Sequence, residues 1–75
     1  MTTKLNYNEL KHKYETFKEN MPEDKFSKCY NELQYVKAII SAIKRENITE
    51  DLDKYMAIKK ENLEELHAMG YKNIK

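Results

Sequence analysis

The chain has 75 residues, with 14 Lys and Arg against 13 Asp and Glu. This length allows one domain with a small core, and we treat residues 1–75 as a single helical domain. The balanced charge, with Arg45 as the single arginine, disfavours a protein whose main task is to neutralise phosphates. One cysteine cannot form an intramolecular disulfide, and no apolar run reaches the ~18 residues of a membrane span, so we expect a cytoplasmic protein.

A first helix is predicted over about residues 6–20. Asn6 and Glu9 have the spacing of a capping box, in which each side chain bonds the backbone N–H of the other residue. Apolar side chains then recur three and four positions apart, as a narrow seam: Tyr7, Leu10, Tyr14, Phe17 and Met21. Such a seam is typical of a helix that buries one narrow face.

A second, longer helix is predicted over about residues 22–46. Pro22 is tolerated in a first turn, and Asn20 with Glu23 repeats the capping-box spacing. Residues 33–43 are apolar around an arc much wider than the ~100° stripe of an ordinary surface helix. This helix therefore needs cover on more than one side. The first helix is expected to cover one flank, and the third helix or a partner the flank that carries Tyr35, Ala38, Ile39 and Ala42.

A third helix is predicted over about residues 50–69. Asn47 or Thr49 can cap its start, and Gly70 is well placed as the left-handed residue that ends it. Its apolar face consists of Leu52, Tyr55, Met56, Leu63, Leu66 and Met69, interrupted midway by Lys59 and Asn62. The tail, residues 70–75, is short and polar, and we expect it to be loose, with a return of Tyr71 to the bundle as the alternative.

The short breaks between these helices favour antiparallel neighbours. We therefore predict an all-α fold: a small, mostly antiparallel three-helix bundle with a long central helix.

Few side chains suggest chemistry. Cys29 lies on the inner stripe of the second helix and is predicted to be a packed core thiol. It has no metal-ligand spacing with His12 or His67, so neither a metal nor a cofactor is expected. Among the six tyrosines, core positions are predicted for Tyr7, Tyr14, Tyr30 and Tyr55.

Tyr35 is the exception, because it lies on the second apolar flank of the central helix, and Tyr is favoured in protein interfaces. We take Tyr35, Ile39 and Ala42 as candidate interface residues. Lys59 is added because it interrupts the apolar stripe of the third helix, where a partner could supply an acid.

We expect a non-catalytic function, since no catalytic, metal or nucleotide motif is present. The first hypothesis is a small protein-binding regulator or inhibitor that covers a surface of a larger protein. A homo-oligomeric assembly protein, most simply a dimer, is the alternative, and a nucleic-acid-binding transcriptional regulator is a weaker third. The abundance of residues with A/T-rich codons suggests a phage or a low-GC bacterium as the source.

Overall fold

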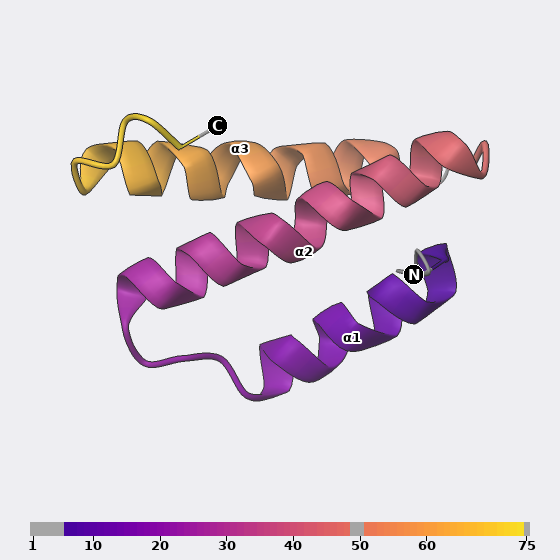
Figure 1. Cartoon of the computed structure of the whole chain (residues 1–75), viewed down its shortest axis with the longest axis horizontal. Coiled ribbons are helices and arrows are strands. Elements are labelled where there is room, and N and C mark those ends of the chain that lie inside the picture. Colours follow the sequence, from indigo (N-terminus) through magenta and orange to yellow (C-terminus); the bar gives the residue numbers. More distant parts are fainter. Residues whose placement is uncertain (1–5, 49–50, 75) are drawn as a thin grey trace, which may run out of the picture.

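The described part of the chain forms three helices, shown in Figure 1. The computed structural model describes residues 6–48 and 51–74, in which α1 (Tyr7–Glu19), α2 (Lys25–Arg45) and α3 (Leu52–Ala68) follow one another without any strand. The predicted all-α three-helix bundle is confirmed. Consecutive helices run in opposite directions, and α2 lies between the other two (Figure 1). With 21 residues α2 is longer than α1 or α3, and it packs against both.

The start of α1 follows the sequence prediction. The Asn6 side chain accepts a hydrogen bond from the Glu9 N–H at 2.8 Å, and the Glu9 carboxylate accepts one from the Asn6 N–H at 3.4 Å. This is the predicted capping box. It satisfies amides at the helix start that have no partner inside the helix.

The predicted start of α2 at Pro22 is wrong. The helix begins at Lys25, after Asp24, whose carboxylate accepts a hydrogen bond from the Ser27 N–H at 2.8 Å. Asn20 does not cap α2, because it ends α1: its side-chain amide donates to the Thr16 carbonyl at 3.2 Å. The connection between the two helices is therefore longer than the sequence spacing indicated.

Asn47 ends α2 instead of capping α3. It adopts a left-handed conformation with φ 58°, and the N–H that follows it, from Ile48, bonds the carbonyl of Ile43 at 2.9 Å. This is the hydrogen bond of a Schellman motif. The other proposed cap, Thr49, and residue 50 lie outside the described residues. The residue before α3 is Asp51, also left-handed at φ 60°, and its side chain makes no cap hydrogen bond.

Gly70 ends α3 as predicted. Its φ of 104° is left-handed, and the Tyr71 N–H bonds the Leu66 carbonyl at 3.0 Å. The expectation of a loose tail is wrong for the described residues 71–74. Ile74 packs against the core, and its carbonyl lies 2.8 Å from the His67 imidazole.

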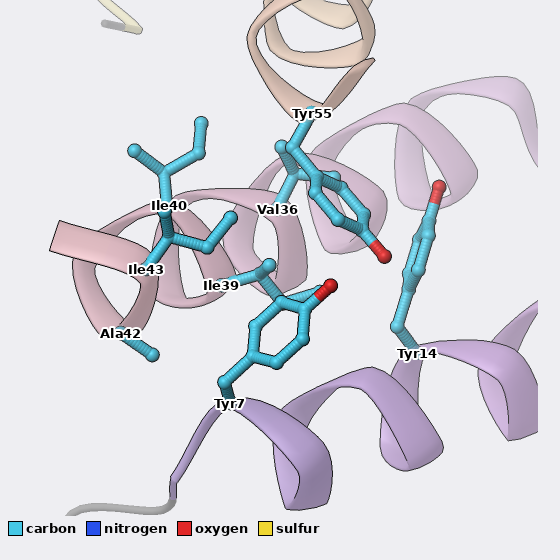
Figure 2. Packing of buried hydrophobic residues seen from close by; sticks show 8 residues of the cluster. All are labelled: Tyr7, Tyr14, Val36, Ile39, Ile40, Ala42, Ile43 and Tyr55. Carbon is cyan, nitrogen blue, oxygen red and sulfur yellow. The ribbon is translucent and has the colours of Figure 1, made fainter. Parts of the chain in front are cut away.

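Among the described residues, the buried side chains form two clusters. The larger one joins all three helices and consists of Tyr7, Tyr14, Val36, Ile39, Ile40, Ala42, Ile43 and Tyr55 (Figure 2). The smaller one joins α2, α3 and the tail and consists of Cys29, Leu33 and Leu66, with Phe26, Leu63, Met69 and Ile74 packed around them. The wide apolar arc of α2 is thus covered on two sides, and helices of the same chain supply the cover.

Candidate interaction surface

Tyrosine rings connect α1 to α3. The rings of Tyr14 and Tyr55 meet edge to face with their centroids 6.1 Å apart. The Tyr7 hydroxyl donates a hydrogen bond to Asp51 at 2.9 Å, and the Tyr14 hydroxyl donates one to Glu32 at 2.7 Å. Figure 2 shows the Tyr55 hydroxyl directed into the space between the other two rings.

These tyrosines are held in their neutral form. Burial, followed by the hydrogen bond to Asp51, raises the pKa of Tyr7. Burial, followed by the hydrogen bond to Glu32, raises the pKa of Tyr14, and burial with the charge of Asp51 raises that of Tyr55. The faces of the rings are occupied as well, since ammonium groups lie 5.4–5.8 Å from the three centroids: Lys11 over Tyr7, Lys18 over Tyr14 and Lys54 over Tyr55. The cluster therefore fixes the position of α1 relative to α3.

Cys29 is a buried thiol, 2% exposed, as predicted. Its Sγ donates to the Glu65 carboxylate at 3.2 Å. Burial and this hydrogen bond raise the pKa of the thiol, which lowers its reactivity. In the part of the chain that the structure describes, no group of three or more His, Cys, Asp or Glu side chains is arranged to hold a metal ion.

The structure does not bring the four candidate interface residues together. Ile39 and Ala42 are completely buried in the larger core cluster, and Figure 2 shows Ile39 beside the Tyr7 ring. Neither side chain is available to a partner unless the bundle opens. Tyr35 is half-buried at the edge of this cluster, and Lys59 is half-buried on α3.

Tyr35 lies between two shallow hollows that follow the junction of α1 and α2. Its ring centroid is 5.1 Å from that of Phe17. One hollow is lined by His12, Lys13, Thr16, Phe17, Asn20 and Tyr35, and the other by Leu10, Lys13, Asn31, Gln34, Tyr35 and Ala38. We call the two hollows together the Tyr35 groove. It offers an aromatic and aliphatic floor with amide groups along its rim.

The charged side chains that line the Tyr35 groove are basic. Lys13 lines both hollows, His12 lines one, and no carboxylate is found among the described residues that line them. Glu9, one turn before Lys13, accepts a hydrogen bond from the Asn6 backbone at the start of α1. The groove therefore favours anionic over cationic groups.

A second hollow lies on α3. It is lined by Met56, Lys59, Lys60, Leu63, Glu64 and His67, which we call the α3 surface. Met56 was predicted on the buried face of the helix, but it is 46% exposed. Ile58 and Asn62 face the core in its place, beside Leu52, which was predicted there. The Asn62 side-chain amide donates to the Ile58 carbonyl at 3.1 Å. Unlike the Tyr35 groove, the α3 surface carries charges of both signs.

Sequence reasoning missed most residues of the Tyr35 groove. Lys13, which lines both hollows, was not among the predicted interface residues. Tyr30 was predicted to lie in the core, whereas it is 39% exposed and stacks on Phe26 with centroids 5.6 Å apart. One signal could have found the groove: Leu10, Lys13 and Phe17 follow one another along a single edge of α1 at helical spacing.

Comparison with family models, curated proteins and solved structures found no match to this chain. Among the described residues, no helix combines the length and the apolar character that crossing a membrane requires.

Proposed function

We propose that this chain is a small non-catalytic regulator or inhibitor that binds a larger protein through the Tyr35 groove. The observation that carries the proposal is the half-buried Tyr35 ring with a hollow on each side. An aromatic side chain that already packs on its own core loses little conformational freedom when a partner covers it. Interface centres are enriched in such residues.

Tyr35 differs from the two buried tyrosines of α1 in the contacts that its side chain makes. The hydroxyls of Tyr7 and Tyr14 donate hydrogen bonds to carboxylates, and lysine ammonium groups lie over their rings. Tyr35 contacts Phe17 and Tyr14 on one side, while its remaining surface lines the two hollows. Ala38, with its small side chain, keeps the second hollow open.

A pair of alanine substitutions tests this proposal. Ala38→Glu fills the groove, and Ala57→Glu places the same side chain on the exposed face of α3 as a matched control. Both variants are checked for helix content and melting temperature, and then used with the wild-type chain to capture proteins from cells that encode it. The supporting result is a protein that, once purified, binds the wild-type and Ala57→Glu chains but not Ala38→Glu. Equal binding by all three chains would contradict it.

A homodimer through the α3 surface is the second candidate. Lys60 and Glu64 both line this surface. If two copies met antiparallel about a point between these residues, Lys60 of each copy would face Glu64 of the other, and the surface would complement itself. The exposed Met56 side chain would be covered in the same contact. Light scattering over a wide concentration range tests it with Met56→Glu as the variant. A dimer that this variant dissociates supports the candidate, and a monomer at all concentrations contradicts it.

A further inference from the structure

We propose that the occupant of the Tyr35 groove is an acidic amphipathic helix, which lies along the junction of α1 and α2. This inference rests on the proposed function and adds the chemistry of the partner.

The shape of the groove suits a helix. Its two hollows follow one another along two packed helices, on either side of Tyr35. An added helix would place side chains from successive turns in the two hollows, which is how helices bind grooves between helices. The floor residues Leu10, Phe17 and Ala38 match the apolar face of such a helix.

The charge of the groove selects an acidic helix. Lys13 stands between the two hollows, so a carboxylate beside the apolar face of the partner can pair with it from either hollow. The other lysines of the same helix, Lys11 and Lys18, lie over the rings of Tyr7 and Tyr14 instead. The amides of Asn31 and Gln34 add neutral hydrogen-bonding groups on the opposite rim.

A second copy of this chain is a poor occupant of the groove. A two-fold contact would set each groove against the same groove. The Lys13 side chains of the two copies would then lie in the same apolar interface. The described residues that line the groove include no carboxylate that could pair with them. Like charges in an interface oppose association, so the groove favours a different protein.

The probes for this inference are two designed helical peptides that share one apolar face. The first carries Glu beside that face and the second carries Lys at the same positions. Binding to the folded full chain is measured by fluorescence anisotropy at low salt. We expect the Glu peptide to bind the wild-type chain at least about tenfold more tightly than the Lys peptide, and this preference to weaken as salt is added.

Charge-reversal variants locate the site. Lys13→Glu is expected to weaken binding of the Glu peptide about tenfold and to strengthen binding of the Lys peptide. The reason is that the variant replaces an attractive Lys–Glu pair by a repulsive Glu–Glu pair. Lys60→Glu makes the same charge change on the α3 surface and is expected to leave both affinities within about twofold. Ala38→Glu is expected to abolish binding of both peptides.

Each other outcome overturns the inference. If the two peptides bound with equal affinity and Ala38→Glu abolished the binding of both, the groove would bind helices without selecting acidic ones. If Lys60→Glu weakened binding of the Glu peptide and Lys13→Glu did not, the acid-binding site would lie on α3. If neither peptide binds while a captured protein still depends on Ala38, the proposed function stands and the helical occupant is excluded.

Discussion

The Tyr7 hydroxyl and the Asp51 carboxylate join the first turn of α1 to the residue before α3, at a donor–acceptor distance of 2.9 Å. The backbone N–H of the same tyrosine donates to Glu46, beyond the end of α2, at 2.8 Å. Tyr7 therefore connects α1 to the ends of both other helices. Because Leu10, Lys13 and Phe17 of α1 line the Tyr35 groove, its shape depends on the contacts that hold α1 in place.

Removing the Tyr7 hydroxyl should destabilise the bundle. Tyr7→Phe leaves a partly buried carboxylate without its donor, and the expected cost is about 1–2 kcal/mol in the free energy of unfolding. Tyr30→Phe, at a position that is 39% exposed, is the control and should change stability by less than about 0.5 kcal/mol. Urea unfolding followed by circular dichroism measures both, and equal effects would contradict the role given to Tyr7.

Alkaline pH should unfold the protein through the buried tyrosines. The pKa values of Tyr7, Tyr14 and Tyr55 are raised above the ordinary value of 10.0 in the folded state. Above pH 10.0 the unfolded chain therefore loses protons that the folded chain retains, and stability falls as pH rises. Below pH 10.0 this contribution is fully present. Melting temperatures measured from pH 8 to pH 12 test it, with Tyr55→Phe expected to flatten the alkaline decline.

Helix content recorded during the same alkaline titration can contradict this prediction. If all tyrosines ionise while the helices remain intact, the buried hydroxyls do not contribute to stability in the way described.

Gly70 should resist substitution for a reason of backbone geometry alone. A Cβ atom built on Gly70 would meet no atom within 4 Å, so space is not limiting, but φ is 104°. Gly70→Ala should cost about 1–2 kcal/mol in the free energy of unfolding, because the left-handed conformation strains an L side chain. Gly70→Asn should cost less, since Asn tolerates this region better. An alanine variant as stable as the wild type would show that the tail does not require this conformation.

Packing of the tail against the core should protect it from proteolysis. Ile74 packs on the cluster of Cys29, Leu33 and Leu66, and its carbonyl contacts His67. Ile74→Ser is expected to cost about 1 kcal/mol and to speed cleavage by chymotrypsin after Tyr71. Asn73→Ser, at an exposed position beside it, is the control. Identical cleavage rates for the two variants would contradict the docking of the tail.

The Cys29 thiol should react slowly with alkylating reagents. It is 2% exposed, and burial with the nearby Glu65 carboxylate raises its pKa, so little thiolate forms near neutral pH. We expect alkylation in the folded protein to be slower than in urea by at least about tenfold. Rates monitored by mass spectrometry test this, and comparable rates in the two conditions would mean that the cluster around Cys29 opens readily.

Local sequence signals predicted the ends of helices where a short motif decided the geometry. Asn6 with Glu9, and Gly70, are such cases. The start of α2 was missed because Asn20 and Asp24 both suit a helix start, and the competition is resolved by Asn20 bonding back to α1. A spacing rule applied to one helix contains no information about this contact.

The position of the candidate site depended on contacts that periodicity cannot supply. The apolar arc of α2 correctly indicated two covering partners, but not which side chains they would reach. Tyr35 stays at an edge, whereas Ile39 is buried, because α1 is fixed against α3 through Tyr14 and Tyr55. Such contacts between residues distant in sequence are visible only in the folded chain.

The most direct test of the central claim is to locate the bound peptide on the folded chain. Backbone amide signals of the nitrogen-labelled protein are recorded by NMR while the acidic peptide is added. If the peptide binds in the Tyr35 groove, the amides of Lys13, Phe17, Tyr35 and Ala38 shift, with little change along Met56, Leu63 and His67. Shifts confined to the α3 surface, or none in the Tyr35 groove, would contradict this claim.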